Sequence, residues 1–203
     1  MAGRQILETE RLILREFDED DAEAFFALGS DPEVIRYTAD PGGGLKSLEQ
    51  ALEVLRDRPI ADYRKHGFGR WACIHKATGL VIGFAGLKYL EELQEVDLGY
   101  RFLPDCWGQG FATEASRSVM CFAREHLDRQ QVIGLVVPEH TASIRVLEKL
   151  GFTFAGFVEY LGDYSAKYVI DITNDTLSGA QGRARHGVSA HSSPPAVNAP
   201  SRG

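Results

Sequence analysis

One stretch near the middle of the chain, residues 98–115, decides the fold, and it reads LGYRFLPDCWGQGFATEA. Apolar residues alternate with polar ones at its start and just before it, which predicts a strand with one apolar face. These alternating residues are Val96, Leu98, Tyr100 and Phe102. Small residues follow at positions 108, 110 and 112, where they let the backbone turn sharply and approach a ligand closely. With a helix expected from about residue 111 to 127, the stretch predicts a strand, a glycine-rich turn and a helix.

The turn before this helix is a candidate cradle for a pyrophosphate group. The first N–H groups of a helix have no partner within it, and the helix dipole makes this end positive. A P-loop would need the pattern GxxxxGK[ST], and no lysine stands here. A dinucleotide-binding GxGxxG would need a glycine where Thr113 stands. The motif alone leaves open both a phosphate site and a plain tight turn.

The rest of the chain gives the order of the elements around this stretch. Strands are expected at 12–14, 70–76, 80–87, 95–102, 132–137, 152–161 and 166–173; helices are expected after 18–21, at 32, at 47–66 and at 141–150. Ser47 with Gln50 is a capping box, Asp31 precedes a proline suited to a first helical position, and Pro59 breaks its helix. Alternating strands and helices near the end predict an α+β fold with a mixed sheet and helices on both faces.

A second segment, residues 136–152 (VVPEHTASIRVLEKLGF), predicts a strand end, a turn and an amphipathic helix stopped by glycine. Together the two segments resemble the GNAT superfamily of acyl-CoA-dependent N-acyltransferases. They most closely resemble its branch of ribosomal-protein N-terminal (RimJ/RimL-type) acetyltransferases. Further matches are residues 7–14 (LETERLIL), 30–34 (SDPEV) and 82–87 (IGFAGL), so the resemblance covers about residues 7–173.

The resemblance implies a mostly antiparallel sheet that splays at a cofactor cleft. Acetyl-CoA, as co-substrate, would lie where the strands of 95–103 and 132–137 separate, and no metal is implied. Its pantetheine arm would pair with main-chain groups near Phe102 and Leu103. Its pyrophosphate would sit on amides of Trp107, Gly108, Gln109, Gly110, Phe111, Ala112 and Thr113.

Three positions depart from the family pattern. Trp107 opens the phosphate loop, where its indole would either cover the cofactor or pack the loop. His140 replaces a frequent asparagine; it would contact the pantetheine arm, act as a base with a pKa near 6.5, or be an exposed loop residue. Leu147 stands where the superfamily often has a tyrosine that acts as a general acid. Ser143 would then supply a hydroxyl near the leaving sulfur, or be an ordinary serine of the first helical turn.

Asp97 and Glu95 are the candidate bases, because branch members often have an acid at the first position and both side chains share one strand face. The alternative is that both charges simply face solvent. Cys106, beside the turn, offers a covalent route through an acyl-thiol, although direct transfer needs no such step.

Length, charge and cysteine content indicate the number of domains, the kind of partner and the compartment. The chain has 203 residues, which suits one domain at 1–177 followed by a disordered tail at 178–203 rich in Ser, Gly, Ala and Pro. The tail carries three arginines and no acid, so residues 1–177 hold 19 basic against 29 acidic residues. That balance argues against nucleic acid and favours amines or basic proteins as partners. No apolar run suits a membrane helix, and three scattered cysteines favour the cytoplasm.

The sequence therefore predicts an acetyl-CoA-dependent N-acetyltransferase that works as a monomer or homodimer by direct attack of an amine on the thioester. Its acceptor would be a protein N-terminus, or else a small amine such as a polyamine or aminoglycoside. Residues 20–66 would line the acceptor side. A catalytically silent CoA-binding module remains an alternative, motivated by Trp107, His140 and Leu147. A nicotinamide-dependent oxidoreductase is disfavoured by the missing third glycine.

Overall fold

A single mixed sheet organises the structure, and one neighbouring pair of its strands is parallel. The computed structural model describes residues 3–38 and 43–173, and within them the sheet has eight strands in the order β1-β2-β3-β4-β5-β6-β8-β7. The strands are β1 (Gln5–Glu8), β2 (Leu12–Arg15), β3 (Arg70–His75), β4 (Val81–Leu90), β5 (Glu95–Phe102), β6 (Gln131–Val136), β7 (Thr153–Tyr160) and β8 (Asp163–Asp171). Strands β5 and β6 form the parallel pair, and the other described pairs are antiparallel.

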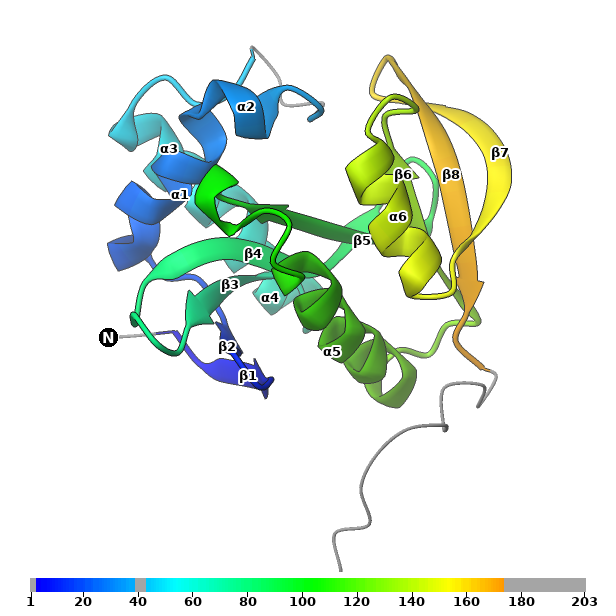
Figure 1. Cartoon of the computed structure of the whole chain (residues 1–203), viewed down its shortest axis with the longest axis horizontal. Helices are drawn as coiled ribbons and strands as arrows, with labels where there is room; N and C mark the ends of the chain where they lie inside the picture. Colours follow the sequence, from blue (N-terminus) through cyan, green and yellow to red (C-terminus); the bar gives the residue numbers. More distant parts are fainter. Residues whose placement is uncertain (1–2, 39–42, 174–203) are drawn as a thin grey trace, which may run out of the picture.

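Helices cover both faces of this sheet. They are η1 (Glu19–Asp21), α1 (Ala22–Ser30), α2 (Pro32–Ile35), α3 (Leu48–Leu55), the π-helical η2 (Arg56–Ile60), α4 (Ala61–His66), η3 (Pro104–Cys106), α5 (Phe111–His126) and α6 (Thr141–Lys149). Figure 1 shows α5 and α6 in front of the sheet, with α6 next to β6, and α4 behind. The mixed sheet with helices on both faces confirms the predicted fold class.

Alternation along the strands divides the buried residues between the two faces. On the face covered by α5, Trp71, Leu87 and Leu98 pack with Val119 and Met120 of the helix. On the opposite face, a second cluster forms beneath the N-terminal helices. Its buried members are Phe17, Ala22, Leu28, Leu55, Ala72 and Phe84. The amphipathic pattern of β5 is thus confirmed, because its apolar side faces α5.

Local signals in the sequence account for the N-terminal helices. The Asp31 carboxylate accepts hydrogen bonds from the N–H groups of Glu33 and Val34, so α2 begins as the cap predicts. The Ser47 hydroxyl accepts from the N–H of Gln50 and caps α3. The Gln50 side chain accepts from the N–H of Lys46 rather than of Ser47, so the capping box is only half formed. Pro59 lies inside η2, so the break that the proline predicts takes the form of a π-helical segment between α3 and α4.

The strands at the two edges of the sheet were harder to predict from the sequence. Strand β1 was not predicted, because its four residues carry a weak pattern, yet it pairs with β2 at the edge. The predicted C-terminal hairpin is present, with β8 placed next to β6 and β7 left at the edge. The expected boundary at residue 177 and the tail 178–203 lie outside the described residues. None of the helices within the described ranges is long and apolar enough to span a membrane.

A buried ion pair fixes the start of α1 against β2. The Arg15 guanidinium donates to both carboxylate oxygens of Asp21 at 2.6 Å, and the two side chains are 15% and 7% exposed. We expect Asp21→Asn to lower the free energy of unfolding by about 3 kcal/mol, because Arg15 is left buried without its counter-charge. Urea denaturation measures this loss. Glu19→Gln is the matched control, since it breaks the exposed pair with Arg56 and should leave the midpoint close to wild type. Equal losses in the two variants would contradict this account.

Candidate active site

Strands β5 and β6 separate after a single shared position, where Asp97 is paired with Ile133. Beyond it, the N–H of Leu135 donates to the Asp97 Oδ1 atom at 3.0 Å. A continuing parallel ladder would instead use a main-chain carbonyl of β5. The Asp97 carboxylate therefore ends the ladder at the point of separation, which confirms the predicted splay of the sheet.

Arg70 holds the other oxygen of this carboxylate. Its Nη2 atom donates to Asp97 Oδ2 at 3.0 Å, and Asp97 is only 5% exposed. The residues across the sheet from Arg70 are Gly86 on β4 and then Gly99 on β5. A Cβ at Gly99 would lie 2.4 Å from the guanidinium, so the missing side chain lets Arg70 cross the sheet. Burial raises the pKa of Asp97, and the charge of Arg70 opposes that shift.

Glu95 lies before the point of separation and is engaged at both oxygens. Its carboxylate accepts from the Lys167 ammonium at 2.5 Å and from the Gln131 amide at 2.8 Å. The two candidate bases thus have different surroundings. Asp97 is buried where β5 and β6 separate, whereas Glu95 links β5 to β8 and β6 through its ion pair and hydrogen bond. Neither carboxylate simply faces solvent.

The glycine-rich turn leads directly into the start of α5. Gly108 and Gly110 have φ values of 71° and 84°, the left-handed region that other residues rarely adopt. Gly110 is the N-terminal cap of α5, and no side chain caps that helix. The first N–H groups of α5, from Phe111 to Thr113, therefore have no side-chain cap to compete with an anion.

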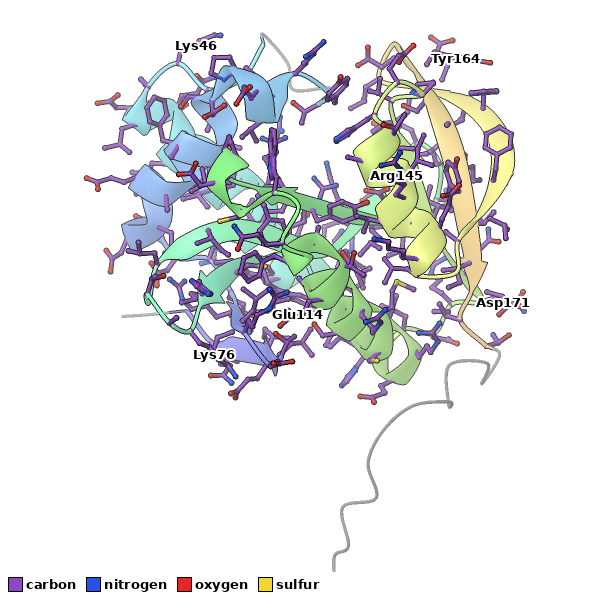
Figure 2. The ribbon with its side chains drawn as sticks, viewed as in Figure 1. Lys46, Lys76, Glu114, Arg145, Tyr164 and Asp171 are labelled. Carbon is purple, nitrogen blue, oxygen red and sulfur yellow. The ribbon has the colours of Figure 1, made fainter. Side chains whose placement is uncertain are left out.

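Contacts from the loop between β1 and β2 hold this turn in place, and the sequence did not predict them. Glu114, on the first turn of α5 (Figure 2), accepts from the Thr9 hydroxyl at 2.6 Å and from Arg11 Nε at 2.6 Å. Arg11 also donates to the Gln109 carbonyl at 2.9 Å and lies over the Phe111 ring. Arg11 belongs to the 7–14 motif, but its partner lies 103 positions away along the chain. Only the folded chain brings the two together.

Several groups expected to meet the cofactor already have partners within the protein. The Leu103 N–H donates to the Ile82 carbonyl, and the Leu103 carbonyl accepts from the N–H of Cys106. The Phe102 carbonyl accepts from the Trp107 indole at 2.7 Å, while that indole is 48% exposed. Trp107 thus packs on the loop and also presents a ring to solvent. The Gln109 amide donates to the Asp105 carbonyl at 2.7 Å, and Phe111 is buried, so both would offer only main-chain groups.

Two hydroxyls meet between β5 and α6. The Tyr100 hydroxyl lies 2.9 Å from Ser143 Oγ and donates to the Ser143 carbonyl at 3.0 Å. Burial raises the pKa of Tyr100, so its phenol stays protonated. Leu147 is buried in the core beside them and offers no proton. The pattern predicted Tyr100 only as a core residue, and its link to Ser143 spans 43 positions.

His140 lies against an aromatic ring from the N-terminal helices. Its imidazole stacks on Tyr37 with ring centroids 4.5 Å apart and an interplanar angle of 12°. Tyr37 lies in the turn after α2, two residues past its end, so the stack joins this turn to the start of α6. Burial lowers the pKa of His140. Its side chain makes no cap for α6, as expected when histidine replaces asparagine.

Other chemistries find little support in the described part of the chain. No group of three or more His, Cys, Asp or Glu side chains is placed there to hold a metal ion. Burial, together with the nearby charge of Asp105, raises the pKa of the Cys106 thiol. A raised pKa leaves less thiolate, which disfavours this cysteine as an acyl-carrying nucleophile.

A mixed sheet that opens beside an uncapped, glycine-rich helix start is the arrangement of an acyl-CoA-dependent acyltransferase. Residues 11–153 match the family described as "Acetyltransferase (GNAT) domain", and the chain belongs to this family. It is a GNAT-type N-acetyltransferase, and such enzymes use acetyl-CoA and bind an amine acceptor.

Relatives agree with this assignment. An uncharacterized N-acetyltransferase of Bacillus subtilis, YoaA, is 34% identical over 152 residues, which cover 74% of this chain and 84% of the relative. An acetyltransferase structure from Agrobacterium tumefaciens has a TM-score of 0.70 at 24% identity and covers 81% of this chain and 92% of that one. RimL, a ribosomal L7/L12 alpha-N-protein acetyltransferase solved with coenzyme A, has a TM-score of 0.70 at 18% identity, covering 83% and 98%. At such identities, the two solved structures show the shared fold.

Adding a side chain to the turn should weaken cofactor binding. Gly110→Val places a β-branched residue at φ 84° beside the free N–H groups, so we expect CoA affinity to fall by about tenfold or more. Calorimetric titration with CoA measures it. Gly79→Val is the control, because Gly79 has φ 72° in the β3–β4 turn with nothing within 4 Å of its added Cβ. Wild-type affinity in Gly110→Val would contradict the assignment of this turn.

The lowered pKa of His140 predicts a pH dependence of stability. Because the folded chain holds the imidazole neutral below its ordinary pKa of about 6.5, it binds fewer protons than the unfolded chain there. This contribution to stability is full above pH 6.5 and is lost as the pH falls through the folded-state pKa. We expect His140→Asn to flatten the fall in the free energy of unfolding between about pH 6.5 and 5, measured by urea denaturation. An unchanged slope in the variant would contradict the shift.

Proposed function

We propose that this enzyme transfers the acetyl group of acetyl-CoA directly to the α-amino group of a protein N-terminus. The observation that carries the proposal is the setting of Asp97, whose two carboxylate oxygens are already held by Arg70 and the Leu135 N–H. A carboxylate so engaged is poorly placed to take a proton from a strongly basic amine. An acceptor that is partly neutral at pH 7 suits this site best.

The ordinary pKa values of amines set the size of this effect. An α-amino group has a pKa of about 7.7–8.0, so roughly a tenth or more is neutral at pH 7. A lysine side chain has a pKa of about 10.4, so only a few parts in ten thousand are neutral. The α-amine therefore needs little help from a base, and correct placement near the thioester supplies much of the remaining acceleration.

The residues at the separation of β5 and β6 fit acetyl-CoA. We assign its pyrophosphate to the amides of residues 107–113 and its pantetheine arm to the open main-chain edge of β5 near Phe102, with His140 beside it. The support is the pair of left-handed glycines and the uncapped start of α5. Since Leu103 is fully engaged within the protein, the pairing groups would be those on the free side of β5. Bound there, acetyl-CoA supplies an activated thioester carbonyl.

We assign to Ser143 the donation of a proton to the leaving thiolate of CoA. When the Tyr100 hydroxyl donates to the Ser143 carbonyl, Ser143 Oγ keeps its own proton free to donate toward the departing sulfur. Tyr100 thus orients Ser143, and the buried phenol retains its proton throughout. Leu147 cannot take this role, so the hydroxyl pair replaces the tyrosine frequent in the superfamily.

Asp97 receives a positioning role in this proposal, since its carboxylate fixes both Arg70 and the Leu135 amide. General-base action remains open to it through a water, with Arg70 opposing the uptake of a proton. We assign Glu95 to the contact with Lys167 and Gln131 rather than to chemistry.

Similarity to RimL, whose name states action on the α-amine of ribosomal L7/L12, supports a protein N-terminus as the acceptor. The sparse and odd number of cysteines supports the cytoplasm as the compartment. A small amine is the second candidate acceptor, because a cavity on the Asp97 face of the sheet is large enough for a small molecule.

Two peptides that differ at one internal position test the proposal: one has a free N-terminus and no lysine, and the other is acetylated at the N-terminus and has one lysine. We expect kcat/KM at pH 7 to favour the α-amine by about 100-fold, following its larger neutral fraction. CoA release measures both rates. Between pH 7 and 9 the α-amine rate should level off, while the lysine rate keeps rising. Equal rates at pH 7 would contradict the assigned acceptor, and binding of acetyl-CoA without turnover of any amine would favour the silent module.

A further inference from the structure

A cavity of about 170 Å³ lies between the N-terminal helices and the face of the sheet that carries Asp97. Its apolar wall includes Phe17, Phe25, Leu28 and Phe84. Its basic lining residues are Arg58, Arg70, Lys88 and Arg101, and Asp62 is its acidic one. We call it the basic cavity. Apolar walls with a few converging polar groups are typical of sites for small ligands.

The charge of this cavity is opposite to that of the whole chain. The chain has a net charge of −7, and acids outnumber bases in residues 1–177. In the cavity, four basic side chains face one carboxylate. The overall charge favoured basic acceptors such as polyamines, whereas the lining of the basic cavity repels them. Local charge at a partly enclosed site outweighs distant surface charge, which water and salt screen.

Lys88 is the residue that most needs a partner. Among the residues that the structure describes, no carboxylate forms an ion pair with Lys88, and the same holds for Arg58, an exposed residue of the cavity lining. Burial lowers the pKa of Lys88, and the charges of Arg70 and Arg58 lower it further, with Asp62 and Asp97 opposing. The Arg70 Nε atom is also buried without a hydrogen-bond partner in the structure. A half-buried cation that forms no ion pair gains from a bound anion.

The position of the basic cavity connects it to the reacting centre. Lys88 lies directly opposite Asp97 in the β4–β5 register, so their Cα atoms are about 5 Å apart and their side chains share one face. Arg70 lines the cavity and binds the Asp97 carboxylate. Tyr100 and Ser143 lie on the other face, with α5 and α6. An acceptor entering from the basic cavity would thus reach the separation of β5 and β6 from the side opposite the cofactor helices.

From this geometry we infer that the acceptor carries a carboxylate, which Lys88 and Arg58 bind in the basic cavity while the amine faces the thioester. The inference rests on the proposed function, because it treats the cavity as the acceptor side of that reaction. A carboxylate would satisfy Lys88, and the aromatic wall would exclude water around the pair. The cavity is lined largely by residues within 17–62, and this range overlaps residues 20–66, the segment predicted to face the acceptor. The carboxylate belongs either to a small amino acid or to an acidic residue near a protein N-terminus.

Two matched pairs of amines distinguish these sources. The first pair is β-alanine and its carboxamide, and the second is the amidated peptides Ala-Asp-Ala and Ala-Asn-Ala. Calorimetry on the protein saturated with CoA measures binding, and CoA release from acetyl-CoA measures turnover. We expect the acid of at least one pair to bind about tenfold or more tightly than its amide. A preference in the first pair assigns a small amino acid, and one in the second assigns an acidic N-terminus.

Three variants assign the preference to the basic cavity. We expect Lys88→Gln and Arg58→Gln each to reduce the ratio of acid to amide affinity toward one. Arg58 is exposed, so its variant keeps the test valid if Lys88→Gln fails to fold. Lys65→Gln is the control, because Lys65 lies on α4 outside the cavity and pairs with Glu91. It should keep the wild-type ratio.

The outcomes separate the inference from the proposed function. Equal binding of acid and amide, binding of neither, or a ratio unchanged in both cavity variants would overturn the inference. If the two peptides are acetylated equally well, the proposed function stands and the carboxylate site falls. If the acid binds through Lys88 and Arg58 but is never acetylated, the site stands and the proposed function falls.

Discussion

The Asp97 carboxylate stands between two strands that would otherwise continue as neighbours. It takes the Leu135 N–H from β6 on one side and the Arg70 guanidinium from β3 on the other. A buried carboxylate is unfavourable alone, so the pairing with Arg70 is what makes the position stable. Gly86 and Gly99 leave the path across the sheet that Arg70 needs. The opening of the sheet depends on this set of contacts.

The opening gives the two faces of the sheet different tasks. On one face, the uncapped start of α5 and the Ser143–Tyr100 hydroxyls suit an anionic thioester cofactor and its leaving sulfur. On the other, the basic cavity suits an acceptor with an anionic group. In the proposed site, backbone N–H groups would hold the first ligand, so few cations would be needed there. The four cations of the basic cavity lie on the face that we propose for the acceptor.

The sequence predicted most elements, because caps, turns and apolar periods are local signals. Asp31 and Ser47 cap the helices that directly follow them, and Pro59 disrupts the helix that contains it. The alternation in β5 identified its apolar face. The site was predicted only in outline. Glu114 and Arg11 are 103 positions apart, and Tyr100 and Ser143 are 43 apart, so no local pattern reveals their contact. The net charge pointed to a basic acceptor, because composition cannot show that η2, β3, β4 and β5 bring their cations into one cavity.

The most direct test is a crystal structure of this enzyme with a non-hydrolysable acetyl-CoA analogue. The account predicts that the pyrophosphate lies on the amides of residues 107–113 and that the thioester position lies between β5 and β6. The sulfur position should be within hydrogen-bond reach of Ser143 Oγ, with the acetyl group directed toward the Asp97 face. An analogue bound elsewhere, or strands β5 and β6 paired along their whole length around it, would contradict the account.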